Sequence, residues 1–139
     1  MRLGGLRRGD PESERGSAVA EFTLVGALLT LLCLAVVQLA LALHIRNTIQ
    51  DAAAEGARTA ALAGATLHDG AERTRQLITM GLGPAYAEQI TAGYADVTGL
   101  QSTEVRVVAP LPLVGLFGIE SALEVTGHAA LELPEELPK

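Results

Sequence analysis

The chain has 139 residues, which is enough for one small domain. Hydrophobic residues make up 49% of it but aromatic residues only 3%, so its apolar content is mostly Ala, Leu and Val and leaves a modest core for any water-soluble part. The formal net charge of −6 argues against nucleic acid as a partner, and the single cysteine, Cys33, excludes an intramolecular disulfide.

Residues 1–16 and 17–43 are predicted to be a short leader and a transmembrane helix. The leader is charged and rich in Gly and Arg, and Pro11 is expected to break any helix there. No charge occurs in the 22 residues from Phe22 to Leu43. A helix of that length rises ~33 Å at ~1.5 Å per residue, which is enough to cross a hydrocarbon core of ~30 Å.

Arginines are unevenly divided about this span, with four before it and two after it over a similar distance. The positive-inside bias therefore predicts a single-pass membrane protein with a cytoplasmic N-terminus and an extracytoplasmic C-terminal part. The arginines before the span are Arg2, Arg7, Arg8 and Arg15, and those after it are Arg46 and Arg58.

Residues 44–65 are predicted to continue the same helix beyond the membrane, because no helix breaker separates the two segments. Small and apolar residues recur there at three- and four-residue spacing, which is typical of one buried helix face. Glu55 and Arg58 can form a surface ion pair. The residues of the expected buried face are Ile45, Ile49, Ala52, Gly56, Ala60 and Ala63.

Residues 66–139 are predicted to form a small extracytoplasmic head that mixes helix and strand. Asp69 and Glu72 resemble a capping box, so a helix is expected from about Gly70 to Leu82. The sequence Gly83-Pro84 should end that helix and begin a short one, which Gly93 stops after about Ala92. The residues expected to be buried in the first helix are Ala71, Leu77, Ile78 and Leu82.

Two strands are predicted in the rest of the head. Val105 and Val107 alternate with polar residues, and alternation continues for eleven residues from Leu123 to Leu133 with Gly127 as a possible bulge. The apolar stretch Ala109–Gly118 is expected to connect the strands. The predicted fold class is therefore α+β: a long N-terminal helix followed by one or two short helices and a small antiparallel sheet, whose strand order the sequence does not reveal.

Glu21 is the one acid at the edge of the apolar run, and three interpretations of it compete. A secretory signal peptide would explain the A-x-A site at Ala40–Ala42, but its apolar region should have 7–15 residues. An unprocessed single-span anchor of an accessory or adhesion module would leave Glu21 as a solvated residue at headgroup level. The third interpretation uses spacing: Gly16 precedes Ser17, and Glu21 is the fifth residue from Ser17, which resembles a prepilin peptidase signal.

The third interpretation gives the carboxylate a physical purpose. A charge deep in a bilayer costs ~2.5–3.5 kcal/mol on insertion scales, and less at a helix N-terminus. Cleavage after Gly16 creates an α-amino group at Ser17 with a reference pKa of ~7.7–8.0. The amine of one subunit can therefore pair with Glu21 of a neighbouring subunit, which couples processing to assembly.

Two separated stretches resemble TadE-like proteins, the pseudopilins of Flp (tight adherence) pilus systems. ERGSAVAEFTLVGALLTLL, Glu14–Leu32, is similar to their start, and DAAAEGARTAALAGA, Asp51–Ala65, is similar to their AA-x-EGAR-x-A stretch. Many relatives carry a Pro a few residues into the apolar run, where this chain has Gly26 and Ala27.

The resemblance implies a minor pilin or assembly factor that a prepilin peptidase cleaves between Gly16 and Ser17. Its implied partners are that peptidase, other pilin or pseudopilin subunits, the membrane machinery of pilus assembly and the lipid bilayer. It also implies that the Glu55, Gly56 and Arg58 motif serves packing against the head or a neighbouring subunit. Removal of residues 1–16 would change the net charge from −6 to −7, because four arginines and three acids leave.

No catalytic, cofactor or metal site is expected. The three histidines, His44, His68 and His128, are far apart and have no metal-ligand spacing. Nucleophile-elbow, zinc-protease, phosphate-loop and dinucleotide-binding motifs are all missing from the sequence. The sequence therefore predicts a structural protein rather than an enzyme.

Overall fold

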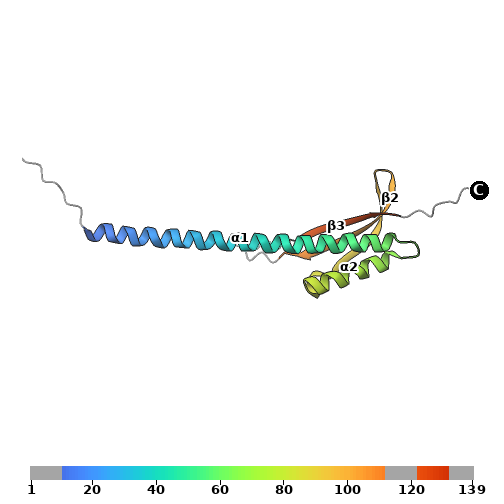
Figure 1. Ribbon diagram of the computed structural model, residues 1–139, viewed down its shortest axis with the longest axis horizontal. Coiled ribbons are helices and arrows are strands. Elements are labelled where there is room, and N and C mark those ends of the chain that lie inside the picture. Colours follow the sequence, from blue (N-terminus) through green and yellow to red (C-terminus); the bar gives the residue numbers. More distant parts are fainter. Residues whose placement is uncertain (1–10, 112–121, 132–139) are drawn as a thin grey trace, which may run out of the picture. The chain divides into compact units, whose positions relative to one another are not determined.

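The computed structural model describes residues 11–111 and 122–131, and for residues 11–14 the backbone only. In chain order the elements are a long helix, a shorter helix, one 3₁₀ turn and three strands (Figure 1). Their bounds are α1 Pro11–Ala61, α2 Leu67–Gly81, η1 Pro84–Tyr86, β1 Gln89–Val97, β2 Leu100–Pro110 and β3 Ala122–Ala130. This confirms the predicted α+β class with its long N-terminal helix and small antiparallel sheet.

The chain forms two compact units, Met1–Leu39 and Ala40–Lys139. The described part of the first unit is helix alone. The second unit holds the last part of α1 and all the other elements, and it contains the whole hydrophobic core. We call this second unit the head unit.

Helix α1 begins at Pro11, so the expectation that Pro11 breaks any helix in the leader is wrong. Proline is tolerated in the first turn of a helix, because the N–H that it lacks has no helical partner there and its fixed φ suits the helix. Residues 12–16 are consequently helical and continuous with the apolar stretch that follows.

Helix α2 begins three residues before its predicted start, at Leu67 instead of Gly70. The N-cap is Thr66, whose hydroxyl accepts a hydrogen bond from the Asp69 backbone N–H at 3.2 Å. The Asp69 carboxylate in turn accepts from the Thr66 backbone N–H at 2.8 Å, which completes a capping box. Asp69 is therefore the third residue of the helix and not its cap. Ile78 is buried as expected, whereas Ala71, Leu77 and Leu82 are half-buried.

The predicted short helix from Pro84 to about Ala92 is wrong. Only Pro84–Tyr86 form a 3₁₀ turn, and β1 begins at Gln89 and includes Gly93. The intrinsic helix preference of the Ala and Glu residues in this stretch is weak, and pairing with β2 along all nine residues of β1 overrides it.

The sheet has the order β1-β2-β3, and both pairings are antiparallel. A two-residue turn joins β1 to β2, with positive φ at Thr98 (55°) and Gly99 (82°), as in a type I′ hairpin. The register between β2 and β3 is continuous from Ser102 opposite Ala130 to Pro110 opposite Ala122, so the expected bulge at Gly127 does not form. The predicted connection Ala109–Gly118 is partly strand, and its residues 112–118 lie outside the described residues.

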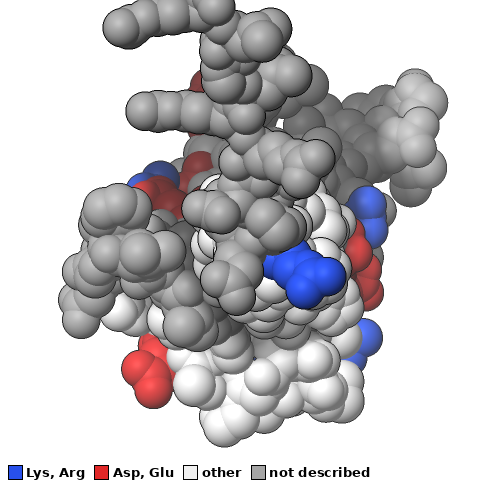
Figure 2. Space-filling model, turned by 90° about the vertical axis from the view of Figure 1, so that its left-hand side faces the viewer, with Lys and Arg blue, Asp and Glu red and all other residues white. Residues whose placement is uncertain are grey.

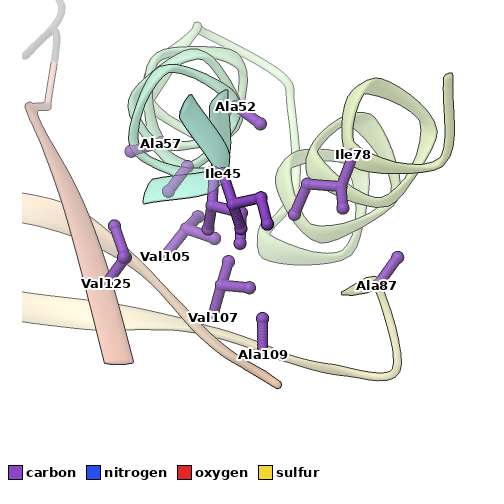
Figure 3. Packing of buried hydrophobic residues seen from close by; sticks show 11 residues of the cluster. Ile45, Ala52, Ala57, Ile78, Ala87, Val105, Val107, Ala109 and Val125 are labelled. Atoms are coloured by element: carbon purple, nitrogen blue, oxygen red, sulfur yellow. The ribbon is translucent and has the colours of Figure 1, made fainter. Parts of the chain in front are cut away.

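The core of the head unit is a single layer between the two helices and one face of the sheet (Figure 3). Side chains from α1, α2 and the strands meet there, and alternate residues of β2 form the side of the core that lies on the sheet. The predicted buried face of residues 44–65 is buried except for Ala63, which lies beyond the end of α1 and is exposed. The core residues are Ile45, Ile49, Ala52, Ala53, Ala57, Ile78, Ala87, Val105, Val107, Ala109 and Val125.

Candidate functional site

Gly16, Ser17 and Glu21 all lie on α1 and are exposed. A side chain added at Gly16 would meet nothing within 4 Å. Ser17 and Glu21 are one helical turn apart and share a face of the helix. The peptide bond between Gly16 and Ser17 is therefore in the first turns of α1, close to an acidic side chain and open on all sides.

The apolar stretch after Glu21 is exposed in the first unit, except at Gln38, which is half-buried. Phe22 is 81% exposed, and the leucines and valines that follow are about half or more exposed. Arg15–Ala61 contains one candidate membrane span by length and composition, with a mean hydropathy of 2.6 in its most apolar window. A helix that presents large apolar side chains on every face requires an apolar surrounding, and a bilayer is one.

The polar side chains at two positions of this stretch are satisfied inside the helix. Thr23 donates its hydroxyl hydrogen to the Val19 carbonyl at 2.8 Å, and Thr30 donates to the Gly26 carbonyl at 2.9 Å. A spanning segment must satisfy its own polar groups, because hydrocarbon offers no partners. Both threonines are therefore compatible with burial in lipid.

Glu21 differs from these threonines. In the part of the chain that the structure describes, its carboxylate takes part in no hydrogen bond and no ion pair. An unpaired carboxylate is costly wherever water is excluded. Glu21 consequently needs a partner from another molecule if its part of α1 leaves water.

Gly56 lies at the point where α1 crosses α2. A Cβ atom at Gly56 would overlap the Thr74 hydroxyl and lie 2.6 Å from the Gly70 carbonyl oxygen. On the α2 side, a Cβ at Gly70 would lie 2.6 Å from the Gly56 carbonyl oxygen. Thr74 holds the crossing by donating to the carbonyl oxygens of Gly70 at 3.0 Å and Ala52 at 3.3 Å. Only glycine at both positions permits this approach.

The alanines beside Gly56 face the sheet. Ala53 and Ala57 are fully buried. A Cβ at Gly127 of β3 would lie 2.6 Å from the Ala53 carbonyl oxygen, so the strand touches the helix backbone directly. Thr103 of β2 donates to the Ala57 carbonyl at 2.7 Å. The Ala- and Gly-rich character of this stretch of α1 thus follows from close packing on two sides.

Glu55 and Arg58 remain on the surface. Arg58 Nη1 lies 3.7 Å from Glu55 Oε2, and their side chains are 44% (Glu55) and 72% (Arg58) exposed. An exposed pair of this kind contributes little to folding. The structure therefore brings Gly56 into the packing of the head unit and leaves the two charged members of the motif accessible.

The other charged groups described in the head unit include two pairs on the strands. Arg106 pairs with Glu124 at 2.8 Å on the outer face of the sheet, and His128 lies 3.7 Å from Glu104. Within residues 11–111 and 122–131, no three potential ligands cluster around a common point. The hydroxyl and then the backbone N–H of Thr66 hold the pKa of Asp69 below its ordinary value, which reflects capping.

The sequence did not reveal the residues against which α1 packs. Gly70, Thr74 and Gly127 form these contacts, and none of them carries a local signal for a contact so distant in the chain. Thr66 did carry a local sequence signal, because a Thr three residues before an acid is the ordinary form of a capping box.

The model of the TadE-like protein family matches residues 16–58. The matched segment contains Gly16, Ser17, Glu21 and the whole stretch from Glu55 to Arg58, so the expected resemblance is confirmed over these residues. The match covers 43 of the 139 residues. No curated protein and no solved structure matches the chain.

Proposed function

We propose that the chain is a pseudopilin or minor pilin that takes part in assembly of a Flp-type pilus or a related secretion apparatus. The observation that carries this proposal is the position of Gly16, Ser17 and Glu21 at the entry to the exposed apolar stretch of α1, within the TadE-like match. The four arginines that precede the span support a cytoplasmic location for this end.

Processing by a prepilin peptidase is the first step of the proposal. Water adds to the Gly16 carbonyl carbon and the bond to the Ser17 nitrogen breaks, leaving a carboxylate on Gly16 and an ammonium group on Ser17. The bond lies within α1, so the first turns must unwind before a protease can bind them in an extended form. Gly16 favours unwinding, because glycine is ~1 kcal/mol less favourable than alanine inside a helix.

Pairing between subunits is the second step. The new ammonium group of one subunit binds Glu21 of a neighbour, which neutralises the only acid at the edge of the span. A helix displaced by one residue along its neighbour would leave both charges without a partner, so the pair also sets the axial stagger.

Glu55, Gly56 and Arg58 have different roles in this proposal. Gly56 positions α2 against α1 and so shapes the head unit. Glu55 and Arg58 stay accessible and can exchange their mutual ion pair for pairs with a neighbouring subunit. The last two turns of α1 then serve folding on one face and assembly on the other.

The test compares Glu21→Ala with Asp51→Ala in cells that contain a prepilin peptidase and the pilus machinery. Asp51 is an exposed acid of the same helix and makes no ion pair within the described part of the chain. We expect Glu21→Ala to be cleaved but lost from assembled material, and Asp51→Ala to assemble normally.

The readouts are intact mass, for cleavage, and the amount of each variant that co-purifies with pili or pseudopili. Normal assembly of Glu21→Ala would contradict the pairing step. A chain that keeps residues 1–16 in the presence of the peptidase would instead support an unprocessed, membrane-anchored accessory or adhesion module.

A further inference from the structure

The end of the head unit at which α1 enters carries few charges. From Gln76 to Ala87 the sequence has no Asp, Glu, Lys or Arg, although the preceding part of α2 holds Asp69, Glu72, Arg73 and Arg75. These twelve residues form the last turns of α2, the turn after it and η1. The uncharged half of α2 is thus the half that leads to this end.

The strands show the same division of charge. In β2, Glu104 and Arg106 precede an uncharged run from Val107 to Pro110. The part of β3 opposite that run, Ala122–Val125, has Glu124 as its one charged residue, and Glu124 pairs with Arg106. The hollow at this end is lined mainly by uncharged residues, with Glu88 as the acidic exception. Figure 2 shows white, uncharged atoms over the lower part of the face that it presents, with an acidic side chain at its left border.

Packing places the uncharged end of α2 near the same height along α1 as Leu43, where the apolar run ends. Helices α1 and α2 are antiparallel, because Gly56 contacts Gly70 whereas a Cβ at Gly81 would lie 3.1 Å from Thr48 Cγ2. Thr48 is five residues after Leu43, or ~7.5 Å along the helix axis. Ile45 follows Leu43 by only two residues and is already 3% exposed, so the packed body of the head unit begins almost directly after the last exposed leucine.

The headgroup layer of a bilayer is thick enough to reach the end of α2. Headgroups add ~10–15 Å in total to the ~30 Å hydrocarbon core, or ~5–7.5 Å on each side. If hydrocarbon ends at Leu43, the C-terminus of α2 lies ~7.5 Å beyond it, at the outer limit of the headgroup layer. Met80 is there, 74% exposed and without a charged residue within three positions.

We propose that this end of the head unit, from Met80 to Ala85 together with Pro110 and Ala122, rests on the lipid headgroups of the outer leaflet. The inference depends on the proposed function, because it requires α1 to span the membrane as far as Leu43. Arg46 is exposed on α1 just beyond Leu43 and can bind lipid phosphates. The contact fixes the orientation of the head unit and directs its charged end, with Glu55 and Arg58, away from the bilayer.

The full chain can test this in vesicles of phosphatidylcholine and phosphatidylglycerol. A polarity-sensitive fluorophore is attached to Met80→Cys in a Cys33→Ala background. The matched control is Arg73→Cys in the same background, because Arg73 is also exposed and seven residues earlier lies on the same face of α2. Lipids with a spin label near the headgroup quench emission only from fluorophores that contact the interface.

We expect a several-fold greater loss of emission, and a blue-shifted spectrum, at position 80 than at position 73. Equal and weak quenching at both positions would overturn the contact, as would equally strong quenching. The native Cys33, labelled in the unsubstituted chain, reports on the span with lipids that are spin-labelled deep in the acyl chain. Strong quenching at Cys33 with none at position 80 contradicts this inference alone, whereas none at Cys33 contradicts the membrane span of the proposed function.

Discussion

At the scale of single residues, glycines set the distances between elements of the head unit. Gly56 and Gly70 let two helix backbones meet, and Gly127 lets a strand touch the backbone of α1. Each replaces side-chain packing by direct backbone contact, which alanine-rich helices need because their side chains fill little space. Glycine is therefore required at these sites by space and not by an unusual φ.

Gly56→Ala should destabilise the head unit. The added methyl group overlaps the Thr74 hydroxyl, so the helices must separate, and overpacking of this kind costs about 1–3 kcal/mol. Thermal unfolding of the full chain in detergent, followed by circular dichroism, would show a lower midpoint. The control is Gly26→Ala on the same helix, where a Cβ meets nothing within 4 Å. An equal fall of the midpoint in both variants would contradict the requirement for glycine where α1 crosses α2.

At the scale of elements, the sequence predicts what depends on local pattern. The existence of one long helix through residues 17–61, the existence of α2 and the strand character of residues 105–107 and 123–130 follow from charge-free length and from periods of 3.6 and two. The buried face of α1 was also predictable, because Ile45, Ile49 and Ala52 recur at helical spacing. These features require no knowledge of distant contacts.

The sequence does not predict what depends on pairing between elements. Residues 89–97 became a strand because β2 offers a complete set of backbone partners, although Pro84 and the Ala residues suggested a helix. Gly127 suggested a bulge. A glycine is instead required there because the backbone of Ala53, 74 positions away in the chain, leaves no room for a side chain. For the candidate site, Gly16, Ser17 and Glu21 were apparent from spacing, but Gly70 and Thr74 were not, since only the fold brings them to Gly56.

Gly127→Ala should separate β3 from α1. Its Cβ would lie 2.6 Å from the Ala53 carbonyl oxygen, and a backbone atom cannot yield as a flexible side chain can. We expect the free energy of unfolding to fall by about 1–3 kcal/mol and amide hydrogen exchange in β3 to become faster. Gly93→Ala in β1 is the matched control, because nothing lies within 4 Å of its added Cβ. If Gly93→Ala were as damaging, the cause would be a general need for glycine in the sheet.

At the scale of the whole molecule, the two units meet different demands. The apolar stretch of the first unit exposes its side chains on all faces and has Glu21 at its edge, which suits a helix that packs in lipid beside its neighbours. The head unit has a core of Ala, Val and Ile residues and keeps ion pairs on its surface. In our account, cleavage after Gly16 converts a membrane anchor into an assembly element, because it supplies the amine that Glu21 requires.

The most direct measurement is the intact mass of the protein purified from membranes of its native cells. We predict a chain that begins at Ser17 and retains the apolar stretch through Leu43. A chain that still begins at Met1, or one that begins beyond Leu43, would contradict the account.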